Sequence, residues 1–403
     1  MICRVCDSPR LDPVIDLGSQ PWCNHFLRRE EVGKEPFYPL RVVYCADCET
    51  AQLDFTVPKE TMFGDHTYLS GVTRSLSQHF EQMASEVNHR FFTTAAKKTI
   101  LDIGSNDGTQ LKHYQRLGWE VLGVESSRGT TRRALAQGIP TRNVFFNSSM
   151  VEDLPKPFQV INAAGVFFHL EELHSVAEGI RRCLASDGVF LVQFLYMQKI
   201  VENGAFDQIY HEHLLYYNLT TLERLLSRHG LVCFDAYLAP IHGGSMMAFV
   251  QHQGGPHAST GREKAILAEE ERKGSNHREW YQRFAGRIAQ MKKENRQLLG
   301  ERKNQGKRIY GMGAPVKGNT LLNYFEIGPD TLDCLVEKNE LRRGLFSPGM
   351  HIPIRMETEI DHPPDVYYVL AWNFKQEILR NQAELVQKGV EFIFPVDPDR
   401  TNP

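Results

Sequence analysis

Three ionisable side chains stand in a row in IYHEHLLYYN, residues 209–218. They are His211, Glu212 and His213, and tyrosines flank them on both sides. In an extended segment alternate residues share a side, so both histidines would point one way and Glu212 the other. Such a group could hold a metal ion, act as an acid/base centre, or be a plain polar loop.

The spacing favours the acid/base centre among these three. A metal site needs ligands pre-spaced on one face, as in H-E-x-x-H on a helix, and H-E-H in a loop lacks that pattern. A general base needs one imidazole near the substrate and a partner that fixes its tautomer. Glu212 could be that partner for His213. The tyrosines could hydrogen-bond to a ring-shaped substrate or stack on it.

A glycine turn in LDIGSNDGTQL, within residues 97–118, predicts a cofactor site. Gly104 and Gly108 let the backbone come close to a ligand at the carboxyl end of an apolar strand, where open α/β sheets bind their ligands. The next strand ends in Glu125, whose carboxylate can accept hydrogen bonds from both hydroxyls of an unphosphorylated ribose. This spacing fits either a dinucleotide or S-adenosylmethionine.

The charges around the turn separate these two cofactors. A nicotinamide site wants G-x-G-x-x-G with a helix amino terminus facing a pyrophosphate. Here Asp102, Asn106 and Asp107 surround the glycines, and carboxylates so close would repel a pyrophosphate but suit an ammonium and a sulfonium. The sequence therefore predicts S-adenosylmethionine. Further predicted cofactor contacts are Ser105, Ser126 and Ala164.

The elements that must position these groups alternate between strand and helix. FQVINAAGVFFHLEELHSVAEGIRRCLASDGVFLVQF predicts a strand, a loop, a helix, a glycine turn at Gly188 and another strand. His169, at the start of that helix, is either a capping or packing residue or a catalytic one. The H-E-H loop follows the last of these strands, and Asn218 is a suitable cap for the helix after it.

Two C-x-x-C pairs at the amino terminus predict a metal centre. CRVC and CADC offer the thiolates of Cys3, Cys6, Cys45 and Cys48, the tetrahedral set of a structural zinc site. A redox C-x-x-C would normally be single. Between the pairs, PWCNHFL and PFYPLRVVYC predict short antiparallel strands that brace or cover a neighbour. The remaining cysteines are interpreted as small buried hydrophobes.

The last third of the chain predicts a second sheet. Residues 262–300 form a charged helical segment that links two domains, and apolar strands then alternate with helical runs. The turn GMGAPVKGN places Gly311, Gly313 and Gly318 around Lys317 and could direct amides and the lysine toward phosphate oxygens. A connecting turn between strand and helix would also need glycine.

Bulk composition narrows the class of protein. The 403 residues are 41% hydrophobic and 24% charged, as in a soluble globular protein of two or three domains. A net charge of -3 gives no electrostatic footprint for a nucleic acid. No segment has the length of apolar residues that a membrane helix or a signal peptide needs. We expect a cytoplasmic protein that uses neither membrane nor nucleic acid.

Several segments together resemble the S-adenosylmethionine-dependent C-methyltransferases that act on nucleotide-linked keto sugars. The resemblance rests on the paired cysteines, DHTYLSGVT, LDIGSNDGTQL, YHEH with its tyrosines, HGGS, GMGAPVKGNTLLNYFEIG and SPGMHIPI, in that order along almost the whole chain. It implies methyl transfer to the carbon next to the ketone of a nucleoside-diphosphate 4-keto deoxysugar of the TDP type, with C3 as the expected carbon.

The resemblance also implies residue roles. His213 matches the general base, and Tyr68, His169, Tyr210 and Glu212 match the polar groups around the sugar. An imidazole can remove a proton next to a carbonyl if the enolate oxygen is stabilised, and the enolate carbon can then attack the donor methyl in line. Candidate substrate contacts are Tyr216, His242, Lys317, Asn319, Lys338, Arg342 and Arg343.

The expected fold is α/β in three parts. A zinc-binding module (1–70) precedes a doubly wound S-adenosylmethionine methyltransferase domain (71–260) and a second, Rossmann-like α/β domain that binds the nucleotide sugar (261–403). We expect a monomer. Two other interpretations stay open: a zinc-containing nucleic-acid or protein methyltransferase, and an inactive protein that only binds nucleotide sugars.

Overall fold

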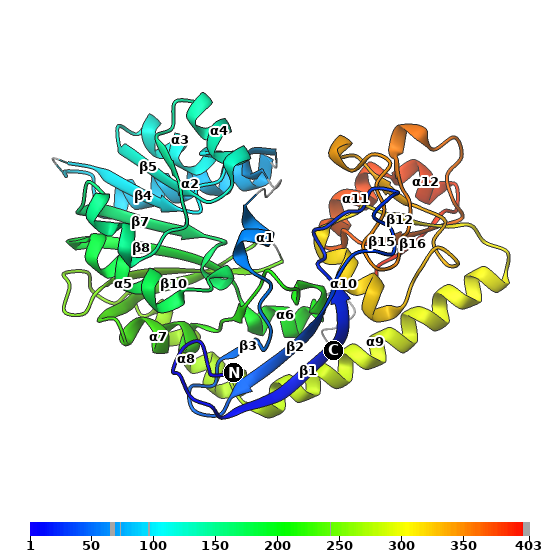
Figure 1. Ribbon diagram of the computed structural model, residues 1–403, viewed down its shortest axis with the longest axis horizontal. Helices are drawn as coiled ribbons and strands as arrows, with labels where there is room; N and C mark the ends of the chain where they lie inside the picture. Colours follow the sequence, from blue (N-terminus) through cyan, green and yellow to red (C-terminus); the bar gives the residue numbers. More distant parts are fainter. Residues whose placement is uncertain (65–68, 73, 96, 242, 398–403) are drawn as a thin grey trace.

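Three sheets carry the fold of this chain. The computed structural model describes residues 1–64, 69–72, 74–95, 97–241 and 243–397. Two α/β lobes lie apart in Figure 1, and the strands β1 and β2 and the long helix α9 run between them along the lower edge. The predicted three-part α/β architecture is confirmed.

The amino-terminal sheet is antiparallel and has the strand order β1-β2-β3-β9. Its strands are β1 (Leu11–Pro21), β2 (Phe37–Cys45), β3 (Ala51–Leu53) and β9 (Leu215–Tyr216). The strand predicted in PFYPLRVVYC is present, but the one predicted in PWCNHFL is wrong, because residues 22–27 leave the sheet. Leu27 instead exchanges backbone hydrogen bonds with Phe346, which lies far along the chain.

The central domain is a seven-stranded sheet with the order β10-β11-β8-β7-β4-β5-β6. Five neighbouring strands are parallel, and β10 and β11 close one edge as an antiparallel pair. The bounds are β4 (Thr99–Ile103), β5 (Glu120–Glu125), β6 (Thr141–Asn143), β7 (Phe158–Ala164), β8 (Leu184–Leu195), β10 (Leu231–Ala239) and β11 (Ser245–His252).

Helices cover both faces of this sheet, and Figure 1 shows α2, α3 and α4 on the side away from α5 and α7. Their bounds are α1 (Lys59–Phe63), α2 (Arg74–Phe91), α3 (Thr109–Arg116), α4 (Arg128–Ala136), α5 (Leu173–Cys183), α6 (Met197–Asn203) and α7 (Leu219–Ser227). Every residue of β4 is buried, as expected for the central strand of a doubly wound sheet.

The turn predicted at Gly188 is wrong: Leu184 already pairs with Phe158, and Gly188 lies in β8 where the register shifts.

The carboxyl-terminal domain has a five-stranded parallel sheet in the order β14-β13-β12-β15-β16. The strands are β12 (Ile309–Met312), β13 (Leu335–Glu337), β14 (Ile354–Met356), β15 (Val366–Val369) and β16 (Glu391–Ile393). The helices are α10 (Val316–Phe325), α11 (Lys375–Asn381) and α12 (Ala383–Gln387). The second parallel sheet predicted from the alternating pattern is therefore present.

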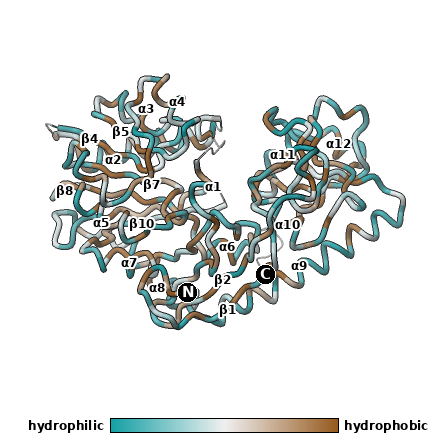
Figure 2. The backbone as a smooth tube through the Cα atoms, viewed as in Figure 1, coloured by the Kyte–Doolittle hydropathy of each residue, from teal (hydrophilic) through white to brown (hydrophobic). Residues whose placement is uncertain are grey.

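The charged segment before this sheet forms two helices, α8 (Arg262–Lys273) and α9 (Arg278–Asn304). They are separated at Gly274, which has a φ of 62° and ends α8 in the left-handed conformation that glycine tolerates best. In Figure 2 much of the backbone of α9 has the colour of hydrophilic residues, whereas hydrophobic residues gather in the sheets. Among the helices of the described residues, none combines the length and apolar character needed to cross a membrane.

Candidate active site and zinc centre

The glycine turn after β4 lies at the carboxyl end of the strand, as predicted. Gly104, Asn106 and Gly108 have positive φ values of 70°, 52° and 79°. A Cβ at Gly104 would overlap Val166, so this glycine packs the turn against the loop after β7. Glu125 closes the turn, since its carboxylate accepts the Asn106 N–H and the Ser127 N–H, each at 2.8 Å.

A buried carboxylate lies beneath this turn. Asp102 accepts a hydrogen bond at 2.5 Å from the side-chain amide of Asn162 on β7. The pKa of Asp102 is raised to about 7, mainly by burial; the Asn162 hydrogen bond opposes the rise and nearby Glu125 adds to it. The Asn162 Oδ1 atom has no hydrogen-bond partner among the described residues. A buried carboxyl and an orphaned amide oxygen fit a cationic group such as the ammonium of S-adenosylmethionine.

Asn162 was missed at the sequence level, although a polar residue inside the apolar strand FQVINAA is a signal for a buried partner. The other predicted cofactor residues lie around the turn. Asp107 accepts the Gly71 N–H at 3.0 Å and the Thr109 hydroxyl at 2.6 Å. The Ser105 hydroxyl is buried against Gly123.

Residues at the ends of β5 and β7 complete this edge of the sheet. The Ser126 hydroxyl donates to the carbonyl of Phe63 at 3.5 Å, and Ala164 is the last residue of β7. The Phe63 ring in turn lies 5.4 Å from the His169 ring, centroid to centroid. The predicted catalytic histidine and the predicted cofactor turn therefore belong to one contiguous region.

His213 is held in one tautomer by the backbone. Its Nδ1 donates to the carbonyl oxygen of Gln208 at 2.7 Å. Because a carbonyl oxygen only accepts, Nδ1 carries the proton and Nε2 is the nitrogen that can gain one. His169 is fixed in the same way, since its Nδ1 donates to the Glu212 carbonyl oxygen at 2.5 Å. The centroids of the two rings lie 5.0 Å apart, so two histidines of fixed tautomer lie next to each other.

Glu212 does not serve as the tautomer partner of His213 among the described contacts. Its carboxylate accepts a hydrogen bond at 2.8 Å from the indole N–H of Trp22, which belongs to the amino-terminal module. The Tyr210 ring lies 3.8 Å from the His213 ring and the Phe168 ring lies 4.7 Å from it. His213 is therefore packed between aromatic rings and is only 3% exposed.

The two histidines of the loop do not share a side, and that expectation is wrong. The His213 N–H bonds to the Tyr210 carbonyl, so the loop closes a turn instead of running extended. His211 contacts β2, where the Pro39 carbonyl lies 3.3 Å from its Nε2, and burial lowers its pKa. Tyr216 is buried in β9. Two further predicted residues, Tyr68 and His242, lie outside the described residues.

The helix after the loop begins as predicted at Asn218. The Asn218 backbone N–H donates to the Thr221 hydroxyl at 3.0 Å within a capping box. Glu270 from α8 adds a second cap, because its carboxylate accepts the Leu219 and Thr220 N–H groups at 2.7 and 2.9 Å. A carboxylate at a helix amino terminus is favourable, so this contact fixes the carboxyl-terminal side of the H-E-H loop.

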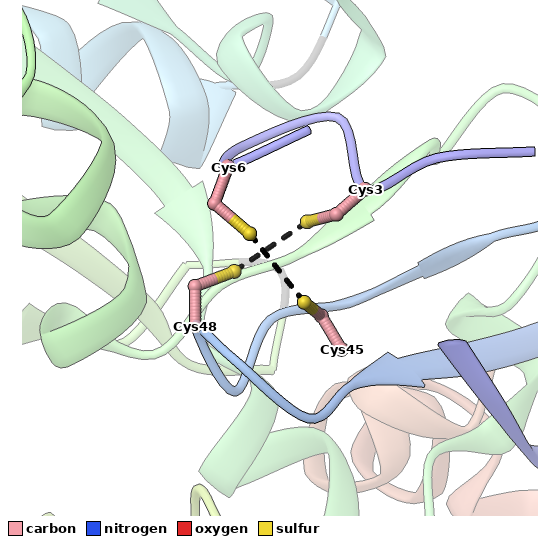
Figure 3. Close-up of side chains that lie close together, drawn as sticks. All are labelled: Cys3, Cys6, Cys45 and Cys48. Carbon is pink, nitrogen blue, oxygen red and sulfur yellow. Dashed lines mark hydrogen bonds between the residues drawn. The ribbon is translucent and has the colours of Figure 1, made fainter. Parts of the chain in front are cut away.

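The four paired cysteines converge on one point, as Figure 3 shows. Their sulfur atoms all lie within 4.8 Å of one another, and the Cys3–Cys48 and Cys6–Cys45 sulfur distances are 3.4 and 3.5 Å. A tetrahedral zinc with bonds of about 2.3 Å needs sulfurs about 3.8 Å apart, so the set fits. The Cys3 thiol lowers the pKa of Cys48 to about 5 through their hydrogen bond. These residues would hold a structural zinc ion.

The zinc-binding module reaches both of the other domains. Beside the cysteines, β3 pairs with β9, which immediately follows the H-E-H loop. At the far end of the hairpin, Glu35 accepts hydrogen bonds from the Gly349 N–H at 2.9 Å and the His351 side chain at 2.6 Å. The module, which was predicted to brace or cover a neighbour, therefore bridges the two other domains. Its Trp22 contacts Glu212.

The second glycine turn, after β12, is closed by an acidic residue as the first one is. Glu337 at the end of β13 accepts the N–H groups of Ala314, Lys338 and Asn339 at 2.9, 2.7 and 3.0 Å. Arg342 lies 3.2 Å from the same carboxylate and 4.4 Å over the Phe26 ring.

The remaining predicted substrate residues are distributed around this turn. Lys317 turns inward, 3.5 Å from Asp207, while Asn319 donates to the Cys23 carbonyl at 2.7 Å. Lys338 and Arg343 lie at the surface, paired with Glu357 and Glu340 respectively. The structure thus brings the Arg342 side chain to the acidic residue that closes the turn, whereas the Lys317, Lys338 and Arg343 side chains pair with other carboxylates.

Comparison with protein families matches nearly the whole chain. Residues 3–63 match the model "Putative zinc binding domain", residues 75–235 match a methyltransferase domain, and residues 240–397 match a C-methyltransferase C-terminal domain. These ranges follow the three parts of the fold. The match to the first family agrees with the cysteine cluster, which lies wholly within it.

A relative that aligns over the full length supports the same family. C-methyltransferase NovU of Streptomyces niveus is 30% identical over 403 residues, covering 99% of this chain and 96% of that protein. Among solved structures, the CcbJ methyltransferase from Streptomyces caelestis is 16% identical, covers 43% of this chain and 89% of its own, and has a TM-score of 0.34. The magnesium protoporphyrin IX methyltransferase of Synechocystis PCC 6803 is 11% identical, covers 47% and 90%, and has a TM-score of 0.35. Likeness at these low scores says nothing about substrate.

The full-length match to NovU and the three family matches agree with the cofactor turn and the four converging cysteines. The chain belongs to the C-methyltransferase family and is an S-adenosylmethionine-dependent C-methyltransferase with a zinc-binding domain.

Proposed function

We propose that the chain methylates the ring carbon next to the ketone, C3, of a nucleoside-diphosphate 4-keto deoxysugar, with His213 as the general base. The observation that carries this proposal is the 2.7 Å hydrogen bond from His213 Nδ1 to the Gln208 carbonyl. It presents Nε2 of a neutral imidazole as the proton acceptor. A C–H group next to a ketone is acidic enough for such a base when the enolate oxygen is stabilised.

Each bond change in the proposed reaction can be given to a group. S-adenosylmethionine supplies a methyl group bound to a positively charged sulfur. His213 Nε2 takes the proton from the sugar carbon, and Tyr210 and Tyr68 are the candidates that hold the enolate oxygen. His169, whose Nδ1 proton is donated to the Glu212 carbonyl, could hold that oxygen only as an imidazolium. The carbon's electron pair forms the new bond to the methyl as the bond to sulfur breaks, leaving S-adenosylhomocysteine. Trp22 keeps Glu212 in place beside the two histidines.

The carboxyl-terminal domain is our candidate for the nucleotide part of the substrate. Its glycine turn presents backbone at the carboxyl end of β12, where α/β sheets bind ligands. Arg342 beside that turn supplies a planar cation that can hold a phosphate in a bidentate manner. Lys338, Arg343, Asn319, Tyr216 and His242 remain candidate contacts. The phosphate role of Lys317 stays a prediction, because its ammonium is directed toward Asp207.

Charge and organisation support a small-molecule substrate. The net charge of -3 gives no attraction for a nucleic-acid backbone. We propose a cytoplasmic monomer divided at residues 1–70, 71–260 and 261–403, in which the zinc module braces the catalytic loop of its own chain.

Product analysis tests this function. The protein is incubated with S-adenosylmethionine carrying a ¹³C methyl and a panel of nucleoside-diphosphate 4-keto deoxysugars. We expect one sugar to gain the label on the carbon next to the ketone, as seen by NMR. Label that appears only in RNA or protein offered in parallel would instead favour a polymer methyltransferase. Binding of the sugar nucleotide without consumption of the donor would favour an inactive binding protein.

A further inference from the structure

A buried ionic cluster joins the carboxyl-terminal domain to the turn just before the catalytic loop. Asp207 is completely buried, and its Oδ2 accepts the indole N–H of Trp372 at 2.7 Å. The same oxygen lies 3.5 Å from Lys317 Nζ, which also lies 3.8 Å over the Trp372 ring. Asp207 belongs to the central domain, whereas the other two residues belong to the second α/β domain.

Burial makes each member dependent on the others. Burial raises the pKa of Asp207 and lowers that of Lys317, and their mutual attraction opposes both shifts. The Asp207 Oδ1 atom has no hydrogen-bond partner among the described residues. Removing one charge from such a cluster would leave the other buried and unpaired, which strongly favours a local rearrangement.

The cluster is one residue away from the group that fixes the base. Asp207 is the middle residue of the short 3-10 turn Phe206–Gln208. Gln208, the next residue, provides the carbonyl that accepts the Nδ1 proton of His213. On the other side, the Phe206 ring packs on Tyr324 and Phe325 of α10 at 5.6 and 5.1 Å. The turn is therefore anchored to α10 by a charge pair and by aromatic contacts.

Lys317 is the second residue of α10 and follows directly on the glycine turn after β12. A single side chain thus connects the turn proposed for the nucleotide with the turn that holds the base. A displacement of about 1 Å at a base can slow a reaction by about a hundredfold, so a fixed joint at this place has consequences for proton abstraction.

We propose that Asp207, Lys317 and Trp372 form an interdomain joint that positions His213 through the Gln208 carbonyl. These are positioning residues, because none of them is assigned contact with the reacting atoms. The inference rests on the proposed role of His213 as the base. It assigns to Lys317 a function in aligning the two domains.

The direct test is the tautomer of His213, read by ¹H–¹⁵N NMR of protein with labelled histidine side chains, without any substrate. The His213 signals are assigned by their loss in His213→Asn. We expect wild type to show a proton on Nδ1 and Asp207→Asn to show a mixture of both tautomers. Trp372→Phe, which keeps the ring but removes one hydrogen bond to Asp207, is expected to give a smaller change of the same kind.

The matched control is Lys388→Met, which removes an exposed lysine of the same domain. It should leave the His213 tautomer as in wild type, whereas Lys317→Met should disturb it and Lys317→Arg should restore most of the wild-type signal. An unchanged tautomer in Asp207→Asn and Trp372→Phe would overturn the proposal. If Asp207→Asn does not fold, Trp372→Phe decides alone.

A kinetic arm links the joint to the reaction. Deuterium exchange into the keto sugar, measured without methyl donor, should slow ten- to a hundredfold in Asp207→Asn while S-adenosylmethionine binding stays at the wild-type level. If wild type itself exchanges no proton, the proposed function fails, and the tautomer measurement still tests the joint. Exchange in Asp207→Asn at the wild-type rate would contradict the positioning role.

Discussion

The two α/β domains carry the same turn with opposite charge. In each, a glycine turn follows a strand, and an acidic residue at the end of the neighbouring strand accepts backbone N–H groups of the turn. Glu125 does this in the central domain and Glu337 in the carboxyl-terminal one. Around the first turn lie Asp102 and Asp107, whereas Arg342 lies against the second acidic residue. The same backbone frame thus suits a cation in one domain and an anion in the other.

If the proposed function is right, this difference would let one chain hold two nucleoside-containing ligands apart. S-adenosylmethionine carries an ammonium and a sulfonium, and a nucleoside diphosphate carries negative charge. Under the proposed function, each turn would attract one ligand and repel the other, so the backbone would not have to discriminate between them. The zinc-binding module bridges both domains and contacts the H-E-H loop between them.

The largest expected effect comes from replacing either of the carboxylates that close the two turns with an amide. Glu125→Gln should weaken S-adenosylmethionine binding about a hundredfold, because a side-chain amide cannot accept two N–H groups and the ribose hydroxyls as a carboxylate can. Glu337→Gln should weaken nucleoside diphosphate binding similarly. Calorimetric titration with each ligand measures both. A variant that lost both ligands equally would break the comparison.

Alanine substitutions at one glycine of each turn should show that the two turns leave different room for a side chain. Gly104→Ala should destabilise its domain by about 3 kcal/mol, since it adds a Cβ at positive φ and overlaps Val166. Gly313→Ala shares the positive φ, but its Cβ would lie 3.4 Å from Ala371, and we expect about 1 kcal/mol. Denaturant midpoints followed by circular dichroism compare the two. Equal losses would show that the backbone conformation alone decides.

The charge of the first turn should make cofactor binding depend on pH. The folded-state pKa of Asp102 is raised to about 7. The protonated carboxyl therefore contributes folding stability that is complete below its ordinary pKa near 3.8 and is lost as the pH rises through about 7. A bound cation favours the ionised form. Affinity for S-adenosylmethionine should therefore rise about tenfold from pH 6 to pH 8 in wild type. Titration of Asp102→Asn should give the same affinity at both pH values, and a slope like that of wild type would refute the role of this carboxyl.

The smallest effect is expected at the cation of the second turn. Arg342→Met should weaken nucleoside diphosphate binding about fivefold at low salt and less at high salt, because salt screens a partly exposed charge. S-adenosylmethionine binding should not change. Arg380→Met, at an exposed arginine on α11 of the same domain, serves as the control. Equal losses in both variants would reduce the effect to net charge.

Local patterns in the sequence predict a large part of this molecule. Strand, glycine turn and helix follow one another in both domains, the cysteine spacing predicts the cluster, and Asn218 predicts a helix start. Contacts between distant segments leave no such pattern. Trp22 reaches Glu212 across 190 positions, and Lys317 turns inward because Asp207 lies buried opposite it.

Some of these misses still have a signal. Asp207 follows Phe206 and lies two residues before Ile209 in FDQI, and a charge in such a partly apolar segment indicates a buried group in need of a partner. The direction of His211 and His213 depended on a backbone turn, which a period-two pattern cannot register. Residues 22–27 lie outside the amino-terminal sheet because the backbone of Leu27 pairs with the carboxyl-terminal domain instead.

Proton abstraction is the central claim, and deuterium exchange tests it most directly. Wild type and His213→Ala are incubated in D₂O with nucleoside-diphosphate 4-keto deoxysugars and without methyl donor, and the sugars are analysed by mass spectrometry and NMR. We predict that wild type exchanges one ring proton next to the ketone and that His213→Ala does not. Exchange at the same rate in both proteins, or in neither while both bind S-adenosylmethionine, would contradict the assignment of His213 as the base.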